Sequence, residues 1–141
     1  SGYVVGGNGS AANIVGVLNG IFYNDASTLK PTFANFYKAT ITPANSEDTV
    51  AFVMDDPFQQ YVVSSDAART QAQFLATYDM NSSAGSDTTG KSSSTLDTSE
   101  TSADGKQFRL IRSAEDPENE DITAAFFSGI VVSNLNSYNQ V

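Results

Sequence analysis

The residues of this chain that could do chemistry are mostly acidic. Asp55 and Asp56 are adjacent, and a second group of carboxylates lies between residues 115 and 121. Several carboxylate and carbonyl oxygens together suit a hard cation such as Ca²⁺. We favour an ordinary solvated acidic turn, because the spacing matches no calcium loop and no glycine supplies the sharp turn. We therefore expect no metal site and no cofactor, although the sequence leaves open whether residues 115–121 take up a cation.

The chain contains no His and no Cys, and this removes most common enzyme mechanisms. Ser-His-Asp triads, imidazole ligands, thiolate zinc sites and Cys nucleophiles are all excluded. Two carboxylic acids alone are enough for a glycosidase mechanism. However, the chain has no Trp, and its sequence gives no sign of a substrate pocket. We expect that the protein is not an enzyme; a small acid-dependent hydrolase is the weakest alternative.

Residues Gly85, Gly90, Lys91 and Ser92 match the phosphate-binding pattern G-x-x-x-x-G-K-[ST]. A phosphate loop needs an apolar strand directly before it and a helix directly after it. Here a polar stretch precedes the pattern and a Ser/Thr-rich stretch follows it. We interpret the match as chance and predict no nucleotide binding.

The charge of the chain also argues against two classes of partner. Seven Lys and Arg against sixteen Asp and Glu give a net charge of −9. Such a surface repels nucleic acid and anionic membranes, which bind to clustered cations. Lys106, Arg109 and Arg112 are the only basic grouping, and no apolar run is long enough to span a bilayer. We expect no nucleic-acid partner and no membrane partner.

The apolar pattern predicts an all-β fold. At 141 residues the chain has the size of one domain. Apolar and β-branched residues favour short strands separated by turns, and at most one short helix, at 66–72. The expected strands lie within 13–25, 49–54, 59–65, 73–80, 103–115 and 122–136. We expect a single β-barrel or β-sandwich domain over residues 13–141, after a flexible N-terminal arm over residues 1–12.

The pattern also makes predictions about connections. Gly16 and Gly20 should mark bulges or the close approach of another backbone. Residues 27–48, which contain two prolines, are expected to be a connection without strands. Asp104-Gly105 is a hairpin signal.

The stretch from Asn81 to Asp104 is unusually rich in hydroxyl side chains. Thirteen of its 24 residues are Ser or Thr, and Leu96 is its only large apolar residue. It could be a disordered linker, a glycosylated stalk or a folded surface segment. We favour an exposed strand in which Ser93, Thr95 and Asp97 alternate with Ser94 and with Leu96, the apolar anchor.

Blocks in this stretch and elsewhere resemble a known family. They are "GVLNGIFYND", "TVAFVMDDPFQQYVV", "GS-TTG-SS-LD" followed by "FRLIR" and "DPEN", and "GIVVSNLNSY". In this order they are similar to small virion proteins of tailed bacteriophages that decorate, or cement, the outside of the capsid. The similarity runs from about Asn13 to Asn136, although the final strand is less charged than in the family.

The resemblance implies a β-rich module without catalysis that binds the major capsid protein on the outer surface of a phage head and stabilises it. The alternative is a receptor- or glycan-binding surface module of a virion. Self-association as a trimer, or else a dimer, is expected at capsid symmetry axes.

Six residues are candidates for partner binding. The Gly-rich arm can follow a neighbouring subunit because Gly adopts conformations that other residues cannot, and the first strand would anchor it. Simple terminal disorder of the arm is the alternative. The candidates are Tyr3, Val4 and Val5 in the arm and Ile14, Val15 and Val17 at the start of the first strand.

Overall fold

The computed structural model describes residues 6, 13–102 and 105–138. Its regular structure in these ranges is β-strand, apart from two single turns of 3-10 helix, η1 at Ala44–Ser46 and η2 at Gln71–Gln73. No helix in the described ranges reaches seven residues, and none is long and apolar enough to cross a membrane. The prediction of a small all-β protein is confirmed.

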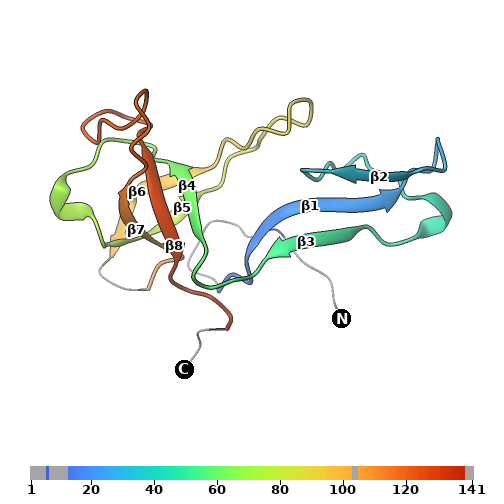
Figure 1. Ribbon diagram of the computed structural model, residues 1–141, viewed down its shortest axis with the longest axis horizontal. Helices are drawn as coiled ribbons and strands as arrows, with labels where there is room; N and C mark the ends of the chain where they lie inside the picture. The colour runs from blue at the N-terminus through green and yellow to red at the C-terminus, as the bar shows by residue number, and fades with distance from the viewer. Residues whose placement is uncertain (1–5, 7–12, 103–104, 139–141) are drawn as a thin grey trace.

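The strands form two antiparallel sheets (Figure 1). The first sheet has three strands in the order β2-β1-β3, and the second has five in the order β4-β8-β7-β5-β6. The strands of the first are β1 (Val17–Asn24), β2 (Pro31–Ala34) and β3 (Val50–Met54). Those of the second are β4 (Gln60–Ser64), β5 (Thr77–Asn81), β6 (Thr95–Ser102), β7 (Phe108–Ser113) and β8 (Ser128–Ser133).

The main hydrophobic core belongs to the five-stranded sheet. Leu110 of β7 lies opposite Val131 of β8, and both are fully buried. Each such aliphatic side chain contributes roughly 1.5–3 kcal/mol when it leaves water. The buried cluster consists of Tyr78, Leu96, Phe108, Leu110, Phe127 and Val131.

The five-stranded sheet curls without closing into a barrel within the described residues. A parallel bridge between Ser65 and Leu96 brings the end of β4 to β6. Leu96 is 1 % exposed, so the expected apolar anchor of the Ser/Thr-rich stretch is confirmed, and β6 is the strand that carries it.

The three-stranded sheet extends away from the five-stranded sheet (Figure 1). The segment 82–94 reaches back toward it, because a Cβ on Gly90 would lie 2.3 Å from the ring of Phe36. Gly90 has a φ of +69°, a conformation that suits glycine. The Ser/Thr-rich stretch therefore touches the connection between β2 and β3.

Some predicted connections and boundaries are wrong. Residues 27–48 contain β2, which begins at Pro31; proline is tolerated there because it is the first residue of an edge strand. The predicted hairpin between the strands on either side of Asp104-Gly105 is wrong, since β5 pairs with both β6 and β7 and lies between them; Asp104 itself lies outside the described residues. In the last predicted strand, regular pairing starts only at Ser128.

The two glycines of the first strand act as expected. The β1–β3 register shifts between Leu18 and Gly20, which marks a bulge. A Cβ on Gly16 would lie 2.1 Å from the carbonyl oxygen of Met54. Gly16 therefore allows the backbone of β3 to approach closely.

Candidate partner-binding surface

The two adjacent acidic residues singled out in the sequence accept hydrogen bonds from other residues of the chain. Asp56 accepts a hydrogen bond from the backbone N–H of Phe58 (2.9 Å), and Asp55 accepts one from the hydroxyl of Tyr138 (3.2 Å). Over the described ranges, no group of three or more carboxylates is arranged to hold a metal ion. Asp56 thus closes its own turn, and Asp55 bonds to a residue far along the chain.

Two carboxylates of the acidic loop, residues 115–121, also accept hydrogen bonds, here from nearby residues of the chain. A side-chain hydrogen bond from Asn119, supported by the backbone N–H of Glu118, lowers the pKa of Asp116 below its ordinary value. The side chain and backbone of Thr123 lower the pKa of Asp121. Both carboxylates are therefore held in the charged state by their own loop.

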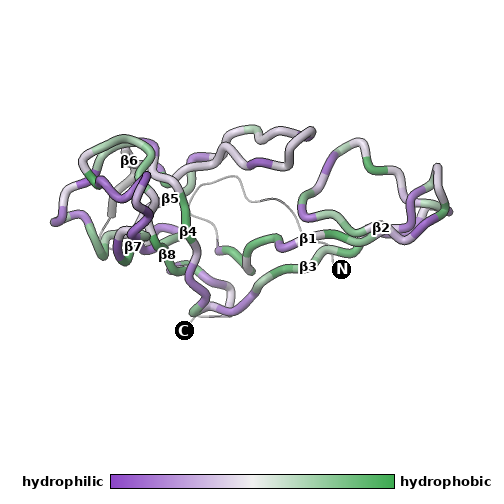
Figure 2. The backbone as a smooth tube through the Cα atoms, turned by 45° about the horizontal axis from the view of Figure 1, so that its top comes forward, coloured by the Kyte–Doolittle hydropathy of each residue, from purple (hydrophilic) through white to green (hydrophobic). Residues whose placement is uncertain are grey.

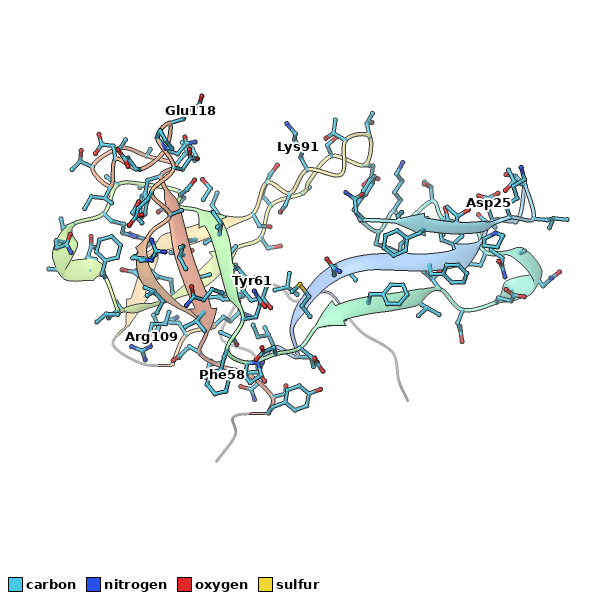
Figure 3. The ribbon with its side chains drawn as sticks, in the orientation of Figure 1. Asp25, Phe58, Tyr61, Lys91, Arg109 and Glu118 are labelled. Atoms are coloured by element: carbon cyan, nitrogen blue, oxygen red, sulfur yellow. The ribbon has the colours of Figure 1, made fainter. Side chains whose placement is uncertain are left out.

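The segment that matches the phosphate-loop pattern closes on itself as a turn. The Ser86 N–H donates to the Lys91 carbonyl (2.9 Å), and the Gly90 N–H donates to the Ser86 carbonyl (2.7 Å). No helix follows Ser92 in the described chain, because strand β6 begins at Thr95. Lys91 lies on this extended loop (Figure 3). The helix N-terminus that a phosphate loop requires is thus not formed.

An open depression lies at the far end of the three-stranded sheet. Its lining includes Tyr23, Asp25 and Lys38. The carboxylate of Asp25 already accepts hydrogen bonds from the hydroxyl and N–H of Ser27 and from the N–H of Thr28. We assign no function to this depression, since its main acidic group is used by the turn.

The most unusual surface is one face of the three-stranded sheet. Phe22 of β1 lies opposite Phe33 of β2 and Val50 of β3, and Gly20 lies opposite Phe52. Paired residues of antiparallel strands share a face, and alternate residues of one strand also do. We call this the apolar face; its large side chains are Phe22, Phe33, Val50, Phe52 and Met54.

These side chains remain in contact with solvent. Phe33 is 63 % exposed, Val50 50 % and Phe52 45 %. Single exposed apolar residues are ordinary, but a contiguous group on a protein surface marks an interaction site. The tube in Figure 2 shows the same apolar character running along β1 and β3.

The two most central rings of the apolar face lie close together, and a glycine leaves room for one of them. The ring centroids of Phe33 and Phe52 are 5.8 Å apart with a tilted arrangement. A Cβ on Gly20, between them on β1, would lie 2.7 Å from the ring of Phe33. The missing side chain leaves room for the ring of Phe33 over the backbone of β1. The two rings thus form one continuous apolar surface.

The opposite face of this sheet is better covered. Ile21 is 2 % exposed, whereas its cross-strand neighbours Ala34 and Ala51 are half-buried. This side carries Ile21 and the two alanines, with Leu18 exposed opposite Val53, whereas the large exposed rings lie on the other side.

Charge is absent from the strands of this sheet and concentrated at the ends of β3. None of β1, β2 and β3 contains Asp, Glu, Lys or Arg. Glu47 and Asp48 precede β3, Asp55 and Asp56 follow it, and all four are exposed. An uncharged apolar centre with an acidic rim suits binding of a protein.

The six candidate binding residues predicted from the sequence differ in where they lie. Tyr3, Val4 and Val5 lie outside the described residues. Ile14 packs against the core of the five-stranded sheet and bridges to Asn136. Val15 is exposed, and Val17 lies opposite Met54 at the root of the apolar face. Their role in binding stays a prediction.

The sequence reasoning missed the apolar face as a unit. The alternation of Val50, Phe52 and Met54 was visible, but Phe33 lay in a segment interpreted as a connection. The run Thr32-Phe33-Ala34 could have identified β2, because it is a short alternation directly after Pro31 and fits an edge strand.

The chain matches no protein-family model, and no curated protein and no solved structure is significantly similar to it.

Proposed function

We propose that this chain is a non-enzymatic virion structural protein that decorates the outer surface of a phage capsid and stabilises it. The observation that carries the proposal is the apolar face, with the exposed rings of Phe33 and Phe52 on a sheet without charge. Burial of such a patch against a partner stabilises the complex, by roughly 25 cal/mol for each Å² of apolar surface removed from water. The virion setting is supported by the ordered sequence blocks between residues 13 and 136.

The proposed partner is the major capsid protein. A decoration protein adds stability by bridging capsid subunits, so it needs a binding surface and no catalytic centre. Self-association into trimers, or else dimers, at capsid symmetry axes would repeat this surface around each axis. The acidic surface of the chain would keep unbound copies apart by mutual repulsion.

The proposal is tested on particles of the virus that encodes this chain. Quantitative mass spectrometry and cryo-microscopy should find the chain on the capsid exterior at a fixed ratio to the major capsid protein. Particles that lack the chain should lose resistance to heat or osmotic shock. Absence of the chain from purified particles would overturn the proposal. Glycan binding combined with unchanged particle stability would favour a receptor-binding module instead.

A further inference from the structure

We propose that the outer edge of β3 is a docking site for an extended segment of a partner protein. The segment would add to the three-stranded sheet as a fourth strand, with apolar side chains at alternating positions and basic residues at both ends. The inference rests on the proposed function only for the identity of the partner, because the binding mode follows from β3 itself.

Strand β3 is an open edge of its sheet. It is the outermost strand of its sheet, and no other strand in the described part of the chain pairs with its outer side. An edge strand leaves alternate N–H and C=O groups without sheet partners, which makes it a template for a further strand. Adding a strand in this way is a common mode of peptide recognition.

Strand β3 also lacks the charged residues and prolines that usually protect an edge. Its sequence, Val50–Met54, contains no charge, no proline and no glycine. The other edge of the same sheet is protected, since β2 is only four residues long and begins with Pro31 after Lys30. Natural edges are blocked by short strands, by proline and by lysine. Of the two edges of this sheet, as far as the described residues show, the β3 edge is thus the one that is both apolar and open.

Large apolar side chains lie beside this edge. Phe52, Val50 and Met54 lie on the apolar face at its β3 border. Alternate residues of an added strand would point to the same side and cover part of these side chains. Apolar residues at those positions would extend the apolar face, and the backbone bonds would set the register.

Acidic residues flank β3 at both ends. Glu47 and Asp48 lie just before β3, and Asp55 and Asp56 lie just after it, all exposed. No Lys or Arg occurs in the sequence between Lys38 and Arg69. Acidic groups at both ends of an uncharged strand favour a segment with Lys or Arg at both of its ends, in either direction along β3.

The same charges disfavour a second copy of this chain at the β3 edge. If two copies paired antiparallel through β3 with Phe52 on the twofold axis, Asp48 of one would lie opposite Asp56 of the other, since each is four residues from Phe52. Like charges directly opposite each other destabilise a strand pair. The occupant we infer is therefore a basic-flanked segment of a different protein.

The test uses the purified full chain and two fluorescent peptides. Both peptides have a centre of alternating Thr and Val; one has two Lys at each end and the other two Glu. We expect the Lys-flanked peptide to bind about tenfold more tightly, as four exposed charge contacts allow. Hydrogen exchange should show new protection at residues 50–54. Equal affinity for the two peptides, no binding, or protection at the edges of the five-stranded sheet instead would overturn the inference.

Matched variants separate local charge from net charge. Asp48→Asn with Asp55→Asn removes two carboxylates beside β3, while Glu118→Gln with Glu120→Gln removes two in the distant acidic loop (Figure 3). The first pair should weaken the Lys-flanked peptide about threefold to tenfold, and the second pair should leave it unchanged. Equal effects of the two pairs would contradict a site at β3.

A peptide methylated on its backbone tests strand pairing directly. Methyl groups on one set of alternate amide nitrogens remove the donors that face β3, and methyl groups on the other set do not. One methylated peptide should lose binding and the other should retain it. Retained binding by both would overturn strand addition. Self-association of the free chain that is blocked by the peptide would show that a second copy occupies the edge.

A failure of the β3 docking site and a failure of the proposed capsid function would give different results. Peptide binding by a chain that is absent from virions would leave the β3 site standing and remove the capsid role. A chain found on capsids without any peptide binding would keep the capsid role and remove the β3 site.

Discussion

Among single residues, Arg69 and Tyr78 carry the most unusual contact. Arg69 is 3 % exposed, and its guanidinium carbon lies 4.4 Å from the centroid of the Tyr78 ring. Burial lowers the pKa of Arg69, and the nearby Tyr78, Asp66 and Asp97 oppose that shift. Contact between a cation and an aromatic face stabilises by about 2 kcal/mol when both are removed from water. This contact joins the η2 region to β5 in the core.

Tyr78 also holds the turn before its own strand. Its hydroxyl donates to the carbonyl of Gln73 at 2.9 Å; the Tyr78 side chain is fully buried, and Gln73 is half-buried. Tyr78→Phe should lower the free energy of unfolding by about 1 kcal/mol, because the half-buried carbonyl of Gln73 loses its donor. Tyr138→Phe is the control, since that hydroxyl bonds at the surface to Asp55. Urea denaturation measures both; an equal effect of the two changes would contradict this account of Tyr78.

The Asp25 turn makes a prediction about pH. The hydroxyl of Ser27, followed by the backbone N–H groups of Thr28 and Ser27, lowers the pKa of Asp25 below its ordinary value of 3.8. Because the folded pKa is lowered, this stabilisation is present above pH 3.8 and is lost as the pH falls through the folded value. Ser27→Ala should raise the pKa of Asp25 in an NMR titration. The pKa of Asp121, set by Thr123, should stay unchanged.

At the scale of elements, the first strand depends on its glycines. A Cβ on Gly16 would meet the backbone of Met54 at 2.1 Å, whereas a Cβ on Gly20 would meet the ring of Phe33 at 2.7 Å. A ring can rotate and a paired backbone cannot. Gly16→Ala should therefore destabilise by about 2–3 kcal/mol and Gly20→Ala by about 1 kcal/mol. Thermal unfolding followed by circular dichroism ranks the two, and the reverse order would contradict the close approach of β1 and β3.

The N-terminal arm makes a separate prediction. If Tyr3, Val4 and Val5 contribute apolar contacts on a capsid, deletion of residues 1–12 should reduce occupancy on particles and their resistance to heat. Ordering a Gly-rich segment is entropically unfavourable, so these three side chains must offset it. Circular dichroism of the truncated chain controls for folding. Full occupancy with unchanged resistance would remove the arm from the mechanism.

The elements that could be predicted are those with local signals. Val50, Phe52 and Met54 alternate, and Leu96 is isolated among hydroxyl residues, so β3 and β6 were visible in the sequence. β2 was hidden because Pro31 usually marks a break, and only its edge position permits it. The placement of β5 between β6 and β7 depends on long-range pairing, which turn residues such as Asp104-Gly105 cannot specify. The apolar face has the same origin, since Phe33 and Phe52 meet only across β1.

At the scale of the whole molecule, the two sheets have different roles. The five-stranded sheet contains the buried cluster around Leu110 and Val131, and it makes the stable body. The three-stranded sheet extends from it (Figure 1). Large apolar side chains of this sheet are exposed to solvent. Ordinary folding favours burial of such rings. Their exposure on an extended sheet is the main support for our proposal that this protein binds a partner.

Hydrogen exchange of the chain on purified capsids, compared with the free chain, tests this account most directly. The account predicts that binding slows exchange in the three-stranded sheet, most strongly at residues 50–54 along the open edge. It also predicts little change in β7 and β8, which are paired on both sides and form the core in the free chain. Protection confined to the five-stranded sheet, with residues 50–54 exchanging as in the free chain, would contradict it.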